Sequence, residues 1–271
     1  MTRVALVQIA SPDDEAPSDR IDRVERLLLR QREADFLILP ELWGAGYLSF
    51  AQYAERAESL DGPTVRMGRR VARELGAAVH LGSILERDAE GGLRNTAVLI
   101  DASGRIAQVY RKIHVFGYES LEAELLTPGD TLSVIESPVG RLGSITCYDL
   151  RFPGLWQQLS LRGAEAVAIP AAWPAARREH WRLLTQARAI EHQVFTLAVN
   201  SCGVQRGVEF GGSSRVVDPS GQVIAECGSE EEVRIVEIDP ARTARVREEF
   251  PVIADRLADY ASISDESGAE Q

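Results

Sequence analysis

Strand-like and helix-like segments alternate along most of this chain, and that alternation is the strongest constraint on its fold. Short apolar runs bounded by turn residues indicate buried strands, whereas apolar residues spaced three or four apart indicate amphipathic helices. The pattern predicts a strand at 3–10, a helix at 18–33 and a second strand at 35–41. Short connections between such units favour sheets covered by helices, in an α/β fold.

The same pattern continues through the rest of the chain. Further helices are predicted at 63–75, where Pro63 stands in the first turn, at 153–162 and at 176–192. Further strands are predicted at 77–86, 94–101, 105–111, 131–136, 141–147, 164–170 and 193–200, with three short ones over 213–239. No linker or repeat interrupts this pattern, so we predict one domain over 1–261. Residues 262–271 are rich in Ser, Glu and Gly and predict a frayed acidic tail.

Composition and charge exclude several classes of protein. The 271 residues carry a formal net charge of −11, whereas a nucleic-acid partner requires a basic face. The three cysteines, Cys147, Cys202 and Cys227, are widely spaced, which indicates reduced thiols rather than a disulfide framework or a zinc site. The chain starts with a strand-like segment, and no apolar stretch approaches the roughly 18 residues that span a bilayer. We expect a cytoplasmic protein without a membrane partner, metal or cofactor.

Of the 30 lysine and arginine residues, Lys112 is the only lysine. Lysine is a compact point charge on a flexible stem, whereas arginine is a rigid fork. Lys112 ends a strand-like run and opens a loop that carries His114, Glu119, Glu122 and Glu124. A narrow site that needs a compact cation beside a reacting oxygen would retain this lysine. The alternative is a surface lysine kept by chance.

Glu41, Lys112 and Cys147 share one kind of position, because each follows an apolar strand and precedes a loop or helix. In layered α/β folds, active sites form at the carboxyl ends of strands. A buried free cysteine is more often a small apolar residue than a nucleophile, but a nearby helix N-terminus favours the thiolate of Cys147. Together the three make chemical sense as a base, an oxyanion-stabilising cation and a nucleophile.

Three segments, in this order and spacing, resemble the Glu, Lys and Cys signatures of the nitrilase superfamily of carbon–nitrogen hydrolases: LPELWGAGY (39–47), YRKIHVF (110–116) and TCYDLRFP (146–153). Three more extend the resemblance to about residue 240: WPAARREHW (173–181), ARAIEHQ (187–193) and SSRVVDPSG (213–221). The resemblance implies a four-layer αββα sandwich. It also implies that Cys147 is the nucleophile, Glu41 the general base and Lys112 the oxyanion stabiliser, with the backbone N–H of Tyr148 completing the oxyanion hole.

The resemblance further implies a second glutamate in the loop before Gly129. Its spacing favours Glu122, with Glu119 and Glu124 as alternatives. This residue would keep Lys112 charged and help orient the amide.

The resemblance also implies residues that contact the substrate. Tyr47 and Trp173 are expected to line the pocket beside Tyr148. Arg151 is expected to be a structural ion-pair partner, and His180 either a substrate-binding or a structural residue.

The block from Trp173 to Glu191 resembles the omega-amidase-like branch, whose members hydrolyse small aliphatic or dicarboxylic mono-amides. We therefore expect an amidase that releases a carboxylic acid and ammonia through a cysteine acyl-enzyme. Its partners would be an amide and water. Ser201-Cys202-Gly203 replaces the Arg-Val-Gly of many relatives, which weakens the prediction of a dicarboxylate substrate. Segment 153–192 resembles the pairing face of the family, which implies a homodimer or larger oligomer.

Several alternatives remain at this point. An N-carbamoyl amino acid amidohydrolase or a nitrilase could use the same scaffold, although Cys-Tyr-Asp at the cysteine favours amides over the Cys-Trp-Glu typical of nitrilases. A catalytically inactive ligand-binding protein is the alternative of another class. FGGSS (210–214) resembles the amidase-signature motif only superficially, and a papain-like pair of Cys147 with His114 or His180 lacks that family's local signatures. The four histidines lack metal-ligand spacing.

Overall fold

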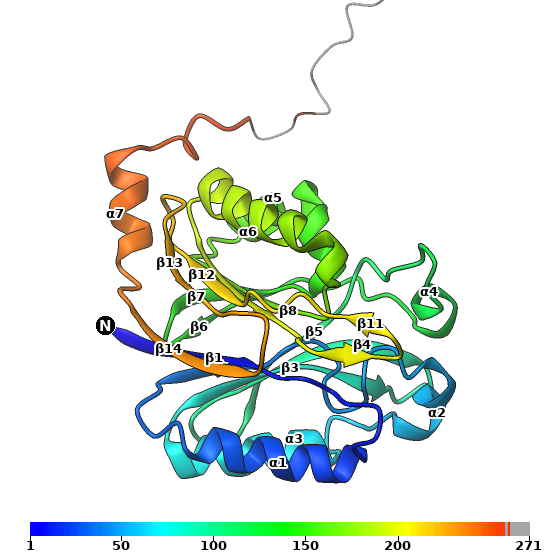
Figure 1. Cartoon of the computed structure of the whole chain (residues 1–271). Coiled ribbons are helices and arrows are strands. Elements are labelled where there is room, and N and C mark those ends of the chain that lie inside the picture. The colour runs from blue at the N-terminus through cyan, green and yellow to red at the C-terminus, as the bar shows by residue number, and fades with distance from the viewer. Residues whose placement is uncertain (258–259, 261–271) are drawn as a thin grey trace, which may run out of the picture.

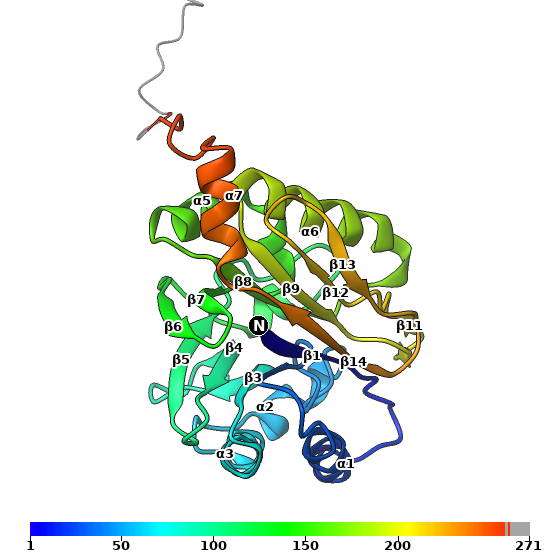
Figure 2. The ribbon, with the colours of Figure 1, turned by 90° about the vertical axis from the view of Figure 1, so that its left-hand side faces the viewer.

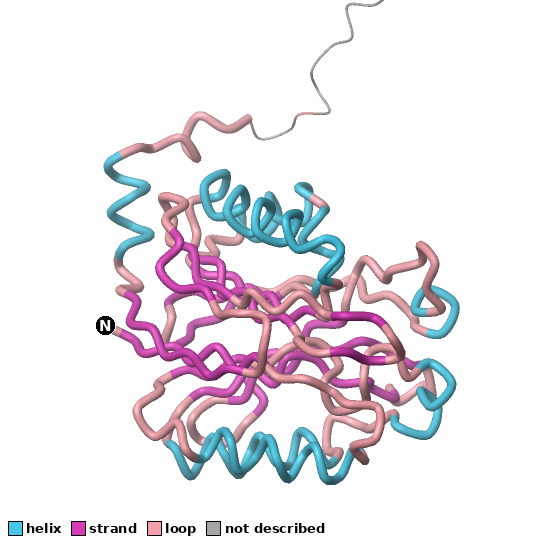
Figure 3. The backbone as a smooth tube through the Cα atoms, viewed as in Figure 1, coloured by secondary structure: helices cyan, strands magenta, loops and turns pink. Residues whose placement is uncertain are grey.

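A computed structural model describes residues 1–257 and Tyr260. Two six-stranded sheets pack face to face, and helices cover the outer face of each (Figure 1). Colouring by secondary structure makes the four layers visible, with strands inside and helices outside (Figure 3). The predicted αββα sandwich is confirmed. The predicted tail, 262–271, lies outside the described residues.

The first sheet is built mainly from the N-terminal part of the chain. In spatial order its strands are β14 (Glu232–Ile238), β1 (Thr2–Gln8), β2 (Phe36–Ile38), β3 (Ala78–Arg87), β4 (Leu93–Ile100) and β5 (Ile106–Arg111). The three strands β1, β2 and β3 run parallel, and the other neighbours pair antiparallel. Their carboxyl ends therefore meet at one edge, where loops can bring side chains together.

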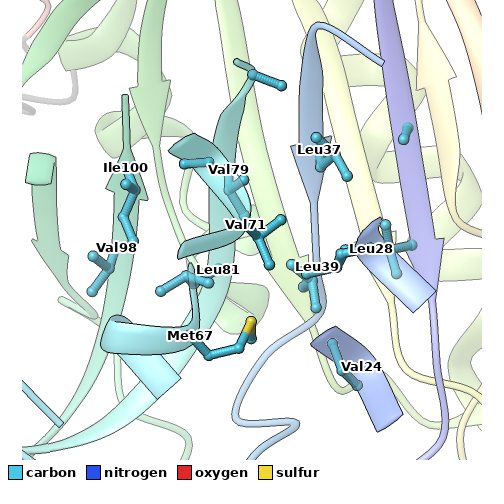
Figure 4. Packing of buried hydrophobic residues seen from close by; sticks show 14 of the residues in the cluster. Val24, Leu28, Leu37, Leu39, Met67, Val71, Val79, Leu81, Val98 and Ile100 are labelled. Carbon is cyan, nitrogen blue, oxygen red and sulfur yellow. The ribbon is translucent and has the colours of Figure 1, made fainter. Parts of the chain in front are cut away.

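Helices α1 (Pro17–Leu29) and α3 (Pro63–Leu75) cover the outer face of this sheet (Figure 2). Pro63 begins α3 and Gly76, in the left-handed conformation at φ 64°, ends it. Figure 4 shows the apolar side chains that pack where both helices meet the strands. Among them are Val24, Leu28, Leu37, Leu39, Met67, Val71, Val79, Leu81, Val98 and Ile100. Their burial holds the first helix layer on its sheet.

The second sheet repeats this arrangement. In spatial order its strands are β13 (Val223–Glu226), β12 (Arg215–Val217), β9 (Phe195–Asn200), β8 (Ala166–Ala171), β7 (Gly140–Ser144) and β6 (Val134–Ser137). The strands β7, β8 and β9 are parallel, and α5 (Pro153–Leu161) and α6 (Arg178–His192) cover the outer face. Apolar side chains from both sheets, including Leu6, Phe36, Leu142 and Leu197, fill the space between them.

Short elements complete the chain. They are the helices α2 (Tyr53–Arg56), α4 (Glu122–Leu125) and α7 (Arg242–Glu249), the 3-10 helices η1 (Phe50–Gln52), η2 (Cys147–Arg151) and η3 (Ala175–Arg177), and the hairpin strands β10 (Val204–Gln205) and β11 (Val208–Glu209). Within the described residues, no helix is long and apolar enough to cross a membrane.

The sequence predicted most strands and helices, and the differences are local with one exception. The first helix ends at Leu29 instead of residue 33, and α7 and the β10–β11 hairpin were not predicted. The exception is β14, which leaves the sheet of β12 and β13 and pairs with β1 (Figure 2). Strand pairing is a non-local choice, so the hydrophobic pattern alone does not reveal it.

Candidate active site

Three strand ends converge between the sheets and bring Glu41, Lys112 and Cys147 together. Glu41 follows β2, Lys112 follows β5 and Cys147 follows β7. Glu41 is completely buried, while Lys112 is 1% and Cys147 7% exposed. Two backbone features fix these positions. Gly82 has φ 67° and passes so close to Pro40 that an added Cβ would lie 1.8 Å from its carbonyl oxygen. Cys147 itself has φ 47°, an uncommon conformation that turns the thiol out of the strand direction.

Lys112 is buried between two carboxylates. Its Nζ donates to Glu41 Oε1 at 2.8 Å and to Glu122 Oε1 at 2.7 Å. Burial alone would lower the pKa of the ammonium, but the charges of Glu122 and Glu41 reverse this and raise the pKa well above its usual value. Lys112 is therefore a permanent cation, with one N–H not used by these two carboxylates.

Of the three candidate loop glutamates, the structure brings Glu122 to Lys112. Glu119 and Glu124 are exposed, whereas Glu122 is fully buried at the start of α4. Its second oxygen, Oε2, accepts hydrogen bonds from the Tyr47 hydroxyl at 2.8 Å and from the Phe116 backbone N–H at 3.3 Å. These bonds orient the carboxylate toward Lys112.

Glu41 faces both the lysine and the cysteine. Its Oε2 accepts the backbone N–H of Ala172 at 2.8 Å, and its carboxylate lies beside the Cys147 thiol and affects the pKa of that thiol. Burial raises the pKa of Glu41; the nearby ammonium of Lys112 opposes this and the charge of Glu122 adds to it. Burial, followed by the charge of Glu41, also raises the pKa of Cys147 well above its usual value. Burial and the neighbouring carboxylate thus oppose the helix-stabilised thiolate that the sequence favoured.

Asn95, on β4, was not singled out from the sequence. Its side-chain Nδ2 donates to Glu41 Oε1 at 2.7 Å and to Glu122 Oε1 at 3.2 Å. Its backbone carbonyl accepts the N–H of Lys112 at 2.8 Å. Asn95 stands between Arg94 and Thr96 in β4, so a polar residue at this position gives no distinct signal in the sequence.

Asp149 connects the turn of the cysteine to the strand of the lysine. Its Oδ2 accepts the Tyr110 hydroxyl at 2.6 Å and the Thr146 backbone N–H at 3.0 Å. Its Oδ1 lies 2.8 Å from His114 Nδ1. Tyr110 lies on β5 two residues before Lys112, so Asp149 fixes the segments of Cys147 and Lys112 relative to each other.

A cavity of about 50 Å³ opens above the thiol. Its lining residues are Tyr47, Phe116, Cys147, Tyr148, Arg151, Ala172, Trp173, Pro174 and Arg177. Tyr47, Tyr148 and Trp173 thus lie where the sequence predicted, whereas the contributions of Phe116 and Arg177 were not foreseen. His180 does not line this cavity; it is exposed and accepts a hydrogen bond from Arg151 Nη2 at 3.3 Å.

Arg151 and Arg177 give the cavity a cationic wall. The guanidinium of Arg151 stacks 4.5 Å from the ring centre of Trp173, and that of Arg177 lies 5.8 Å from the ring centre of Phe116. Neither forms an ion pair with a carboxylate of the described residues, so the expected ion pair of Arg151 is not formed. Ser201-Cys202-Gly203 is absent from the cavity lining.

Comparison with known proteins places this geometry in a family. Residues 3–248 match the model of the carbon–nitrogen hydrolases. The chain belongs to the carbon–nitrogen hydrolase family. It is 38% identical to a 2-oxoglutaramate amidase from Paenarthrobacter nicotinovorans, over 94% of this chain and 90% of the relative. The expected carbon–nitrogen hydrolase of the amidase type is thereby confirmed.

Two solved structures of carbon–nitrogen hydrolases share the fold. A Saccharomyces cerevisiae member of branch 10 of the nitrilase superfamily has a TM-score of 0.83, with 28% identity over 97% of each chain. An amidase from Nesterenkonia sp. AN1, with acrylamide added at its active-site cysteine, has a TM-score of 0.80, with 28% identity over 94% of this chain and 100% of that one.

Proposed function

We propose that this carbon–nitrogen hydrolase cleaves small omega-amides to a carboxylic acid and ammonia through an acyl-enzyme on Cys147. One observation carries the proposal: the thiol of Cys147 lies at a cavity, beside a buried carboxylate that accepts a hydrogen bond from a buried ammonium. A nucleophile, a base and an oxyanion-stabilising cation are the three groups that acyl transfer requires.

The acylation half-reaction follows from these contacts. Glu41 takes the proton of Cys147 while the sulfur attacks the amide carbonyl carbon. The carbonyl oxygen becomes an oxyanion, which the remaining N–H of Lys112 and the backbone N–H of Tyr148 stabilise. Glu41 then gives the proton to the amide nitrogen, the carbon–nitrogen bond breaks and ammonia leaves.

Deacylation reverses the same proton transfers. Glu41 takes a proton from water, whose oxygen attacks the thioester carbonyl, and Lys112 again faces the oxyanion. The proton returns to sulfur as the carbon–sulfur bond breaks, which regenerates the thiol and releases the acid. Glu122 supports both steps by holding the ammonium of Lys112 in place and charged.

The cavity favours a short substrate with an anionic end. A water occupies roughly 10–15 Å³ when measured by its centre, so about 50 Å³ accepts only a few heavy atoms beyond the amide. Arg151 and Arg177 line the wall without a carboxylate partner among the described residues, and a guanidinium pairs well with a substrate carboxylate. These features support omega-amides of dicarboxylic acids, such as 2-oxoglutaramate.

A panel of substrates tests this proposal through ammonia release and kcat/KM. We expect 2-oxoglutaramate and succinamate to exceed propionamide and butyramide. N-carbamoyl amino acids and nitriles are two further classes of substrate in the panel, each forming one arm of the test. Faster turnover of either class would replace the omega-amide assignment, and absence of turnover in every arm would support an inactive ligand-binding protein instead.

We further propose that the enzyme is a dimer or larger oligomer that pairs through α5 and α6. Leu161, Leu183 and Ile190 are 51%, 65% and 51% exposed on these helices, although each is apolar. Exposed apolar clusters of this kind are common at subunit contacts. Sedimentation at micromolar concentration should give twice the chain mass or more; a monomer would contradict the proposal.

A further inference from the structure

We infer that Asn95 is a positioning residue that keeps Glu41 ionised and aimed at the thiol by donating one side-chain amide to both buried carboxylates. The inference rests on the proposed function of Glu41 as the base. Asn95 does not touch the nucleophile or line the cavity, and its action is exerted through the two glutamates and Lys112.

The geometry makes Asn95 the common support of the group. It is 1% exposed, and its Nδ2 lies within hydrogen-bonding distance of Oε1 in both Glu41 and Glu122, the same two oxygens that Lys112 Nζ contacts. Its backbone carbonyl holds the main chain of Lys112. Asn95 therefore supports Lys112 in two ways. Its backbone carbonyl bonds the Lys112 backbone directly, and its side chain bonds the two carboxylates that hold the ammonium.

The charges explain why a neutral donor is needed there. Two ionised carboxylates and one ammonium leave a net charge of −1 in a site closed to water. An uncompensated buried charge is costly, and a further hydrogen bond to an ionised group lowers that cost. A second cation would neutralise the site but would weaken Glu41 as a base. The amide of Asn95 stabilises the carboxylates without removing their charge.

Several ionisable groups surround Glu41 and influence its pKa. These groups are Lys112 after β5, Glu122 on α4, Cys147 on η2 and Tyr47 in the loop before η1, with Tyr53 on α2 behind it. Loss of the Asn95 donor leaves all of them in place. Both carboxylates lose a donor, and Glu41 loses the shorter of the two bonds, at 2.7 Å against 3.2 Å. The charged form of Glu41 is then less stabilised, so its pKa rises and a higher pH is needed to ionise it.

The test compares Asn95→Leu, which removes the donor at similar volume, with Asn95→Asp, which keeps the shape but adds a further carboxyl group. Gln108→Leu is the matched control, because Gln108 is also a buried amide but bonds to Ser133 and Ser144. The readout is the rate of Cys147 alkylation by iodoacetamide as a function of pH, located by mass spectrometry. Alkylation needs no amide substrate, so a wild type without amidase activity would sink the proposed function and leave this test valid.

The alkylation rate should rise with pH as Glu41 ionises, and this rise is the acid limb of the profile. We expect the acid limb to lie about one pH unit higher in Asn95→Leu than in wild type, and higher still in Asn95→Asp. The limb of Gln108→Leu should coincide with that of wild type. If the proposed function holds, kcat of Asn95→Leu should fall roughly 10- to 100-fold with KM nearly unchanged, as expected for a hydrogen bond to a charged group. Should Asn95→Leu not fold, the isosteric Asp variant decides. Acid limbs of the folded Asn95 variants that match wild type would overturn the inference and leave Asn95 a packing residue.

Discussion

Two regions of the site differ in exposure and in the contacts that hold them. The inner cluster consists of Glu41, Lys112, Glu122 and Asn95. The outer wall of the cavity consists of Phe116, Tyr148, Arg151 and Arg177. Members of the inner cluster are at most 1% exposed and are joined by short hydrogen bonds. The outer wall is half-buried and held by ring and guanidinium contacts.

This difference separates two tasks. Stabilising a transient oxyanion requires dipoles and charges that are fixed before the reaction, because reorganising them would add to the barrier. Selecting an acyl group requires only a wall of suitable shape and charge. Changes to the inner cluster should therefore affect every substrate alike, while changes to the outer wall should alter which substrate is preferred.

The largest expected effect is the loss of the nucleophile. Cys147→Ala should reduce ammonia release from every amide below detection, because no thioester can form. Cys202→Ala should retain activity, since Cys202 is buried away from the cavity. In wild type, mass spectrometry should find the acyl group on Cys147 alone; an acyl group on Cys202 or Cys227 would refute the assignment.

Lys112→Arg should be nearly as damaging, although the charge is conserved. Lys112 is enclosed by two carboxylates at 2.7 and 2.8 Å, so the larger planar fork would displace one of them or the substrate oxygen. Loss of one preorganised donor lowers kcat by about 100- to 1000-fold. Arg26→Lys, the reverse exchange at an exposed residue of α1, is the control and should stay within about twofold. A folded, fully active Lys112→Arg enzyme would remove the lysine from the mechanism.

Arg151→Met should sharpen the distinction between the inner cluster and the outer wall, because Arg151 belongs to the outer wall. We expect kcat/KM for 2-oxoglutaramate to fall roughly 10- to 100-fold, the range for a hydrogen bond between charged groups. Propionamide, which has no carboxylate, should be turned over at close to the wild-type rate. Arg66→Met, at an exposed arginine on α3, controls for the loss of charge. An equal loss for both amides would assign Arg151 to the catalytic group instead.

The smallest expected effect is in the pH dependence of kcat/KM, where the ionisation of Glu41 in the inner cluster should set a gradual loss of activity. Glu41 accepts the thiol proton only when ionised, and burial raises its pKa above the usual 4.5. Activity is therefore present above the raised pKa and lost as the pH falls through it, about tenfold per pH unit. Measurement of kcat/KM for an uncharged amide avoids titration of the substrate. An acid limb at or below 4.5 would contradict the burial argument.

Sequence patterns predicted the inner cluster better than the outer wall for a physical reason. Glu41, Lys112 and Cys147 each follow a recognisable strand, and strand ends converge in any layered fold of this kind. The family resemblance implied a further glutamate in this loop, and the spacing from Gly129 favoured Glu122 over Glu119 and Glu124. The site roles assigned to these residues stay predictions until the variants are measured.

Other contributions could not be predicted because they depend on contacts between distant segments. Asn95 is one polar residue within a strand, and only the folded structure brings it to two glutamates. Arg151 and Arg177 lie 26 positions apart and converge through the packing of η2 against the end of β8. The helix α7 is dominated by charged residues and gave a weak apolar pattern.

The pairing of β14 with β1 has a consequence for synthesis. Thr2 faces Ile238 and Gln8 faces Glu232, so β1 is synthesised long before β14, the strand with which it pairs. Until then β1 is an unpaired edge beside a growing chain, a template for wrong association. Contacts so distant along the chain also form slowly. Shortening the chain before residue 238 should therefore affect yield and aggregation before it affects chemistry, although every residue of the proposed mechanism would still be present.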